Sequence, residues 1–280
     1  MYTRLVFTHL AMATLALATC GLSAQTAGAP ASQPVPRTDK NSQLAHQQLL
    51  KKARTGGIDI YFEGDSITRR WGATDCPQYL ANWTNNFFGW NTADFGWGAD
   101  QIQNILWRLE NGELDGVNPK IIVVLAGANN VGAVPGDDAK VADIAQGIKA
   151  ILELCRQKAP DAVIILTGIF PRNDHPAVVP TINQINAKIS QFADGKTIRY
   201  LNVNDQLADP EGRLYEGVMN ADKLHPALPG YQIWADGLKP LFTEILGPPA
   251  QTDHAPPPTG DPKAASKPPA HTGLPPTTQP

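Results

Sequence analysis

Short apolar runs that alternate with helical patterns constrain the fold of this chain more than any other feature. Five runs have the composition of β-strands, at residues 58–62, 92–95, 121–125, 162–166 and 198–203. The third and fourth are continuously apolar, as strands covered on both faces must be. Apolar residues recur at helical spacing in residues 102–109, 144–155, 182–192 and 231–246. The alternation predicts a three-layer α/β/α sandwich with a central five-stranded parallel sheet and right-handed crossovers.

The N-terminal residues 1–24 have the composition of an export signal. Arg4 is the only charge before an Ala- and Leu-rich run that ends at Ala18. That run is too short for a membrane span, which needs about 20 residues, so we expect a cleaved signal peptide. Cleavage after Ala24 is preferred, with Ala29 as the alternative. We therefore expect a periplasmic or extracellular protein without a membrane span.

A lipoprotein anchor through Cys20 is the second interpretation of this end. Residues 17–20 resemble the lipobox that precedes a lipidated cysteine. Thr19 departs from the small Gly, Ala or Ser that is usual at that position. Simple secretion is therefore favoured over lipidation.

The segments that flank the central part of the chain are poor in large apolar residues. We expect residues 25–40 to be a flexible linker and residues 247–280 to be a disordered tail. The tail consists mainly of Pro, Thr, Ala and Gly and contains one large aliphatic residue, Leu274. Such a segment buries too little apolar surface to offset its ordering entropy. The remaining residues, 41–246, have the length of one domain with a substantial core.

Charge and metal-ligand spacing exclude two classes of function. The net charge is −3, from 23 Lys and Arg against 26 Asp and Glu, and no basic run occurs, so nucleic acid is not an expected partner. The six histidines are scattered and no pair has zinc-ligand spacing, so no metal site is expected. Once Cys20 has left with the signal, Cys76 and Cys155 remain. They could pair, or Cys155 could simply pack in its helix.

Polar or small residues follow the first three predicted strands at the point where each strand ends. Ser66 follows the first strand, Gly98 and Ala99 follow the second, and Asn129 and Asn130 follow the third. The carboxyl ends of parallel strands meet at one edge of a sheet, where ligands bind in such folds. The sequence therefore predicts a functional site at this edge.

A serine, a histidine and an aspartate give this edge the parts of a nucleophilic hydrolase. Ser66 closes the tripeptide Gly64-Asp65-Ser66, and His225 lies three residues after Asp222. A serine hydroxyl needs an adjacent base, and an imidazole held by a carboxylate can supply it. The alternative is a turn with Ser66 as a helix N-cap and His225 on the surface. The two motifs together favour the hydrolase.

Acyl transfer also needs donors for the negative charge that develops on the carbonyl oxygen. Asn129 offers a side-chain amide at the end of a buried strand, and residues 96–100 offer main-chain N–H groups before a helix. The glycines of residues 96–100 half-match a dinucleotide-binding motif. Gln101 stands where the third glycine belongs, so nucleotide binding is discounted.

In combination these motifs resemble the SGNH (GDSL-type) serine esterases. The four blocks of that family correspond to Gly64-Asp65-Ser66, residues 96–100, Gly127-Ala128-Asn129 and Asp222-x-x-His225. Residues 105–114 and 119–124 are more specifically similar to the catalytic subunits of platelet-activating factor acetylhydrolase and their bacterial relatives. The resemblance implies a flavodoxin-like sandwich, no metal or organic cofactor, and a possible homodimer.

The resemblance also implies a role for each matching residue. Ser66 would attack the ester carbonyl, His225 would take and return the proton, and Asp222 would hold the imidazole. The main-chain N–H of Ser66, the side chain of Asn129 and a main-chain N–H at Ala99 would bind the oxyanion.

One position departs from the family pattern. Relatives have a glycine directly before the aspartate of the second block, where this chain has Ala99 after Gly98. Alanine keeps the N–H, so it can serve if it tolerates the local conformation. A positive φ would strain Ala99, and Gly98 would then be the alternative donor. Asn130 stands where many relatives have Asp, and we interpret it as loop support.

Export favours an ester on an extracellular small molecule or polymer as the substrate. We expect a short-acyl, acetyl-type esterase, with lysophospholipase or lipase activity as the alternative. A catalytically weak, secreted carbohydrate-binding protein is a hypothesis of another class. A surface adhesin that works through residues 247–280 is a third. The enzyme hypothesis predicts little loss of function when that tail is deleted, whereas the adhesin hypothesis predicts complete loss.

Overall fold

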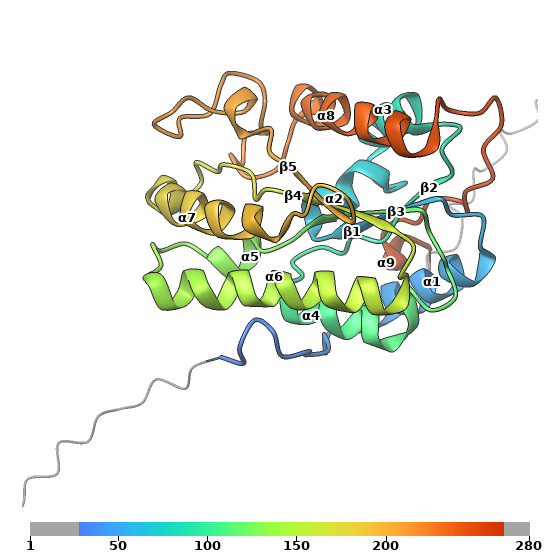
Figure 1. Ribbon diagram of the computed structural model, residues 1–280, viewed down its shortest axis with the longest axis horizontal. Coiled ribbons are helices and arrows are strands. Elements are labelled where there is room, and N and C mark those ends of the chain that lie inside the picture. The colour runs from blue at the N-terminus through green and yellow to red at the C-terminus, as the bar shows by residue number, and fades with distance from the viewer. Residues whose placement is uncertain (1–27, 266–280) are drawn as a thin grey trace, which may run out of the picture.

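Five parallel strands form the central sheet, in the order β2-β1-β3-β4-β5 (Figure 1). The computed structural model describes residues 28–265, so the expected signal peptide lies outside the described residues. The strands are β1 (Ile60–Gly64), β2 (Thr92–Asp94), β3 (Ile121–Leu125), β4 (Val163–Thr167) and β5 (Ile198–Leu201). This confirms the predicted α/β class and the parallel sheet. β1 ends two residues later than expected, because the charged Glu63 is buried inside the strand.

Helices cover both faces of the sheet and complete the three layers. One layer consists of α2 (Ser66–Gly72), α3 (Pro77–Phe87) and α8 (Leu228–Leu246). The other consists of α1 (Lys40–Thr55), α4 (Ile102–Arg108), α6 (Asp138–Lys158) and α7 (Val179–Ile189). Figure 1 shows α3 and α8 on one side of the sheet and α1, α4 and α6 on the other. The shorter elements are η1 (Leu109–Glu113), α5 (Ala128–Val131), η2 (Pro176–Val178), η3 (Ser190–Phe192), η4 (Asn204–Gln206) and α9 (Pro262–Ala265).

Aromatic side chains fill the layer between the sheet and α3 and α8. Phe62 of β1 contacts Trp83, with ring centroids 4.6 Å apart, and Trp71 stacks on Trp234 at 4.9 Å. Edge-to-face and offset contacts of this kind add to the free energy of burial. Most of the aromatic-rich segment in residues 83–97 is thus core, and Phe88 is its half-exposed member.

Helix α1 did not follow from the apolar pattern. Asp39 caps it by accepting the main-chain N–H of Ser42 over 2.9 Å. Its buried face includes Leu49 but also the polar His46 and Lys52. Because polar side chains occupy half of that face, the periodicity of apolar residues is weak.

The N-terminal segment, residues 30–39, packs on the domain, which differs from the expected flexible linker. The main-chain N–H of Ala31 donates to the Asp143 carboxylate over 3.1 Å, and Ala31 is fully buried. The N–H of Val35 donates to the carbonyl of Gln103 over 3.0 Å. The segment is held by hydrogen bonds to α4 and α6, which composition alone does not reveal.

The segment after α8 also differs from expectation. Residues 247–261, the C-terminal strap, run along the β2 side of the sheet toward α9 (Figure 1). The N–H of Ala250 donates to the carbonyl of Gly89 over 2.9 Å, and the N–H of Gly89 donates to Asp253 Oδ2 over 2.7 Å. The strap has no core of its own, but its prolines lower the entropy that ordering costs. Residues 266–280 lie outside the described part of the chain.

The strap lies near β2, an edge strand that has a neighbour on one side only. Buried Lys52 links the two by donating to the carbonyl of Asp94 over 2.7 Å and to Thr259 Oγ1 over 2.9 Å. Burial lowers the pKa of Lys52 to about 8, although the Asp94 carboxylate opposes this shift. A loop and an inward-pointing lysine are two ways in which proteins block edge-to-edge association.

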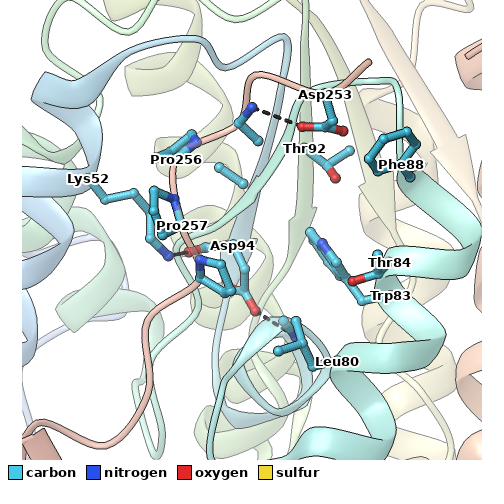
Figure 2. A pocket seen from close by; sticks show the side chains of 14 residues that line it. Lys52, Leu80, Trp83, Thr84, Phe88, Thr92, Asp94, Asp253, Pro256 and Pro257 are labelled. Carbon is cyan, nitrogen blue, oxygen red and sulfur yellow. Dashed lines mark hydrogen bonds between the residues drawn. The ribbon is translucent and has the colours of Figure 1, made fainter. Parts of the chain in front are cut away.

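A pocket of about 280 Å³ lies between the strap and α3. Figure 2 shows Pro256 and Pro257 on one side of it, Trp83 and Phe88 on the other, and Thr92 of β2 between them. The strap does not pair with β2 as a sixth strand.

Candidate active site

Ser66 is the first residue of α2, and only Asp65 separates it from the end of β1. Asp65 caps the helix, because its Oδ1 accepts the N–H of Ile67 over 2.9 Å. This strand-to-helix turn places the Ser66 side chain, half-buried, at the carboxyl edge of the sheet, as predicted. The N–H of Ser66 is in the first turn, so it has no acceptor within the helix.

The structure brings the three predicted nucleophile, base and acid residues together. Ser66 Oγ lies 2.8 Å from Nε2 of His225. Nδ1 of the same ring lies 2.8 Å from Oδ2 of Asp222. A carboxylate on Nδ1 makes that nitrogen the donor, which leaves Nε2 as the acceptor for the serine hydroxyl. This is the tautomer that a general base requires.

The turn from Asp222 to His225 is built to hold the imidazole. Asp222 Oδ1 accepts the main-chain N–H groups of Leu224 and His225, over 3.1 and 3.0 Å. Lys223 has a positive φ of 57°, which reverses the chain between acid and base. The same carboxylate therefore fixes both the turn and the ring, within four residues.

Electrostatics at this site favour the neutral imidazole. Burial lowers the pKa of His225 below its ordinary value of 6.5; the hydrogen bond to Asp222 raises it and the charge of Arg70 lowers it. Burial raises the pKa of Asp222, but hydrogen bonds from the main-chain N–H groups and from the imidazole outweigh it and lower that pKa to about 2. Near pH 7 the pair is a neutral imidazole beside a carboxylate. Arg70 Nη1 donates to Asp222 Oδ2 over 3.4 Å.

The turn at residues 96–100 approaches Ser66 along the neighbouring strand. The N–H of Trp97 donates to the carbonyl of Gly64 over 3.0 Å, which joins the ends of β2 and β1. Ala99 is exposed and has a φ of 62°, in the left-handed region. Ala99 therefore has the positive φ that was expected to strain it, at a cost for an L-residue of roughly 1–2 kcal/mol. The φ of Gly98 is not positive.

A buried ionic cluster fixes the inner side of this turn. Arg108 donates through Nε to Asp100 Oδ2 and through Nη2 to Glu63 Oε1, each over 2.7 Å. Its Nη1 donates to Glu113 and, over 3.0 Å, to the carbonyl of Phe95. All four ionic side chains are buried. Removing Arg108 would leave three buried carboxyl groups without their shared partner, so the cluster locks the end of β1 to the turn.

Asn129 enters the site from α5, the short helix after β3. Gly127 precedes this helix with a φ of 110°, in the left-handed region that favours glycine. The side-chain Nδ2 of Asn129 donates to the carbonyl of Asp100 over 2.8 Å. Asn130 supports the loop by accepting the N–H of Ile102 over 2.9 Å, as interpreted from the sequence.

Two arginines at this edge were not identified from the sequence as functional. Arg108 lies within the motif that carries the family resemblance, and its charge among apolar helix positions was an available signal. Arg37 lies in the expected linker, and no sequence pattern marks it. Its Nη1 donates to the carbonyl of Gly98 over 3.1 Å and to Asp100 Oδ1 over 3.2 Å.

Other candidate chemistry is absent from the described part of the chain. Within residues 28–265 no group of three His, Cys, Asp or Glu side chains could hold a metal ion. No helix in that range is both long and apolar enough to cross a membrane. Cys76 and Cys155 are both free thiols, so the structure has Cys155 packed in α6 and not paired.

Comparison with known proteins identifies a family. The sequence model of the GDSL-like lipase/acylhydrolase family matches residues 62–233. The chain is 29% identical to human platelet-activating factor acetylhydrolase IB subunit alpha1 over 223 residues, which cover 78% of this chain and 91% of that protein. It is 30% identical to the human alpha2 subunit over 207 residues, covering 72% and 83%. In fold it is similar to a GDSL-like lipase from Bacteroides thetaiotaomicron, with a TM-score of 0.58, 17% identity, and coverage of 72% and 100%.

Proposed function

This chain belongs to the GDSL-like lipase/acylhydrolase family, and we propose that it is an exported serine esterase that hydrolyses short-chain, acetyl-type esters. The observation that carries the proposal is the continuous hydrogen-bonded series Ser66–His225–Asp222, with 2.8 Å at each link. A capped turn or a surface histidine would not require that alignment.

Acylation begins when Ser66 Oγ attacks the ester carbonyl carbon and passes its proton to His225 Nε2. Asp222 stabilises the imidazolium that forms, without taking the proton itself. The tetrahedral intermediate collapses, the bond from carbon to the alcohol oxygen breaks, and His225 returns the proton to the leaving alcohol. The acyl group then remains on Ser66 as an ester.

Deacylation repeats the sequence with water as the nucleophile. His225 removes a proton from the water, the hydroxide attacks the acyl carbon, and the proton returns to Ser66 Oγ as the carboxylic acid leaves. No redox step or metal is needed to balance either half-reaction.

Three donors would hold the negative charge of the tetrahedral intermediates. They are the N–H of Ser66, the N–H of Ala99 and the second amide hydrogen of Asn129, whose first is engaged by Asp100. Each such donor contributes roughly 3 kcal/mol of transition-state stabilisation. We assign the second donor to Ala99 and not to Gly98, because the strained alanine keeps its main-chain N–H and adopts the left-handed conformation that a glycine would adopt there.

The acetyl preference and the export are supported by different observations. The curated relatives are named platelet-activating factor acetylhydrolase subunits, which favours a small acyl group. The composition of residues 1–24 favours export. An exported acetylesterase would act on an extracellular small molecule or polymer.

The test is hydrolysis of p-nitrophenyl acetate, butyrate and octanoate by the full-length protein, beside its Ser66→Ala variant. We expect turnover of the acetate, loss of nearly all turnover in Ser66→Ala, and falling kcat/KM as the acyl chain lengthens. A preference for octanoate would contradict the proposed acetylesterase activity and favour a lipase-type enzyme. Equal, negligible rates for both proteins would refute the esterase.

A further inference from the structure

Arg37 lies outside residues 62–233, which match the family model, yet its guanidinium reaches the proposed oxyanion site. Nη1 donates to the carbonyl of Gly98 over 3.1 Å and to Asp100 Oδ1 over 3.2 Å. Nη2 pairs with Asp39, the cap of α1, at 3.0 Å. The side chain thus connects the N-terminal segment to the turn after β2.

The carbonyl that accepts from Arg37 belongs to the same peptide group as the N–H of Ala99. A peptide unit is planar, and in its trans form the C=O and N–H point in opposite directions. The described residues contain no cis peptide. Holding the Gly98 carbonyl on the Arg37 side therefore directs the Ala99 N–H to the other side. A charged donor on the carbonyl also polarises the peptide and strengthens its N–H as a donor.

The outer side of the turn has few other restraints. Ala99 is exposed, and no heavy atom lies within 4 Å of where a Cβ of Gly98 would stand. The left-handed conformation of Ala99 is intrinsically unfavourable, and such strain persists only where the surroundings over-determine it. Arg108 restrains the inner side through Asp100, so Arg37 supplies the restraint on the peptide itself.

We propose that Arg37 is a positioning residue of the esterase: it fixes the plane of the Gly98–Ala99 peptide so that the Ala99 N–H faces the oxyanion. This inference rests on the proposed function. The N-terminal segment, residues 30–39, would then contribute to the active site, although it precedes the residues that match the family model.

The experiment compares Arg37→Ala and Arg37→Lys with the wild type and with Arg54→Ala, which removes an exposed arginine of α1. We expect kcat on p-nitrophenyl acetate to fall about 10- to 100-fold in Arg37→Ala, with KM nearly unchanged. Deleting an oxyanion donor lowers kcat roughly 100- to 1,000-fold, and a donor that is present but poorly oriented should cost less. Arg37→Lys restores part of kcat, since a lysine keeps one charged donor. Arg54→Ala matches the wild type.

Chemical rescue separates positioning from a structural role. Arg37 is about a quarter exposed, with 28% of its side chain accessible, and lines a cavity of about 300 Å³ with Trp97 and His46. Guanidinium chloride at millimolar concentration can therefore enter the space that Arg37→Ala leaves. We expect it to raise kcat of Arg37→Ala several-fold and to leave the wild type unchanged.

Hydrogen exchange supplies a measurement that does not depend on turnover. In Arg37→Ala the N–H groups of Asp100 and Ile102, which donate to Trp97 O and Asn130 Oδ1, should exchange faster than in the wild type. If the wild type hydrolyses no ester, the proposed function fails, and exchange alone decides whether Arg37 holds the turn. Unchanged exchange, or a loss of kcat that follows the loss of folded protein and that guanidinium does not restore, would overturn the inference.

Discussion

Nδ2 of Asn129 donates to the carbonyl of Asp100 over 2.8 Å, across the end of the strand that leads into Ser66. The two residues follow β3 and β2, and β1 lies between those strands in the sheet. The hydrogen bond therefore joins the two segments that flank the proposed nucleophile. It engages one amide hydrogen of Asn129 and leaves the second for the proposed oxyanion.

Replacing Asn129 with alanine should reduce kcat by roughly 100- to 1,000-fold, with a smaller change in KM. The variant loses a donor that acts mainly in the transition state, and it also loses the bond to Asp100. Steady-state kinetics with p-nitrophenyl acetate would measure both parameters. Asn85→Ala, an exposed asparagine of α3, is the matched control and should behave as the wild type. An Asn129→Ala enzyme with unchanged kcat would remove this side chain from the oxyanion site.

Ala99 offers a test of backbone strain. Glycine adopts a φ near 60° without a steric penalty, so Ala99→Gly should raise the free energy of unfolding by up to about 1 kcal/mol and keep kcat within a few-fold. Ala99→Val should lower both the free energy of unfolding and kcat, because β-branched residues rarely adopt a positive φ. Urea unfolding of the three proteins measures the difference. A glycine variant that is clearly less stable than the wild type would contradict the left-handed assignment.

The pH dependence follows from the direction of the His225 shift. The base must be neutral to accept a proton, and burial lowers the pKa of His225 below 6.5. We therefore expect kcat/KM to increase with pH, with a midpoint below pH 6.5, and to reach a plateau near pH 7. Arg70 disfavours the imidazolium, so Arg70→Gln raises the pKa of His225 and should move the midpoint to higher pH. Profiles of kcat/KM from pH 4.5 to 8 would show the change, with Arg54→Gln as the charge-matched control. A midpoint that does not move would mean that Arg70 has no electrostatic effect on the base.

The sheet and the positions of the proposed catalytic residues were predictable from the sequence, because each depends on local pattern or on topology. Continuous apolar runs identify buried parallel strands, and the carboxyl-end rule places Ser66, Ala99 and Asn129 at one edge without any side-chain geometry. Asp222 and His225 lie close together in sequence, so their contact needed only one turn.

The parts that were missed depend on contacts between distant polar groups. Arg108 and Glu63 form an ion pair in the core, but the sequence does not show which buried charged residues pair with each other. The N-terminal segment and the strap are poor in apolar residues and are held by main-chain hydrogen bonds to the finished domain. Composition therefore predicts a flexible linker and a disordered tail, whereas contacts with the folded domain order residues 30–39 and 247–261.

The strap supports a final prediction about stability. A chain that ends at Gly247 loses the hydrogen bonds made by Ala250, Asp253 and Thr259, among them the bond that Thr259 Oγ1 accepts from Lys52. Each lost hydrogen bond contributes about 0.5–1.5 kcal/mol, so we expect the melting temperature to fall by several degrees. The newly open edge of β2 should also make the protein self-associate at high concentration.

The matched control is a chain that ends at Ala265, which keeps the described contacts of the strap and should melt as the full chain does. Calorimetry gives the melting temperature, light scattering gives the association state, and p-nitrophenyl acetate gives the activity of the folded fraction. We expect that activity to survive truncation at Gly247, because Ser66, His225 and their partners make no bond with the strap among the described contacts. Full loss of activity at unchanged melting temperature would instead place the strap in the site. A chain that melts and associates like the control would show that the strap does not protect the edge.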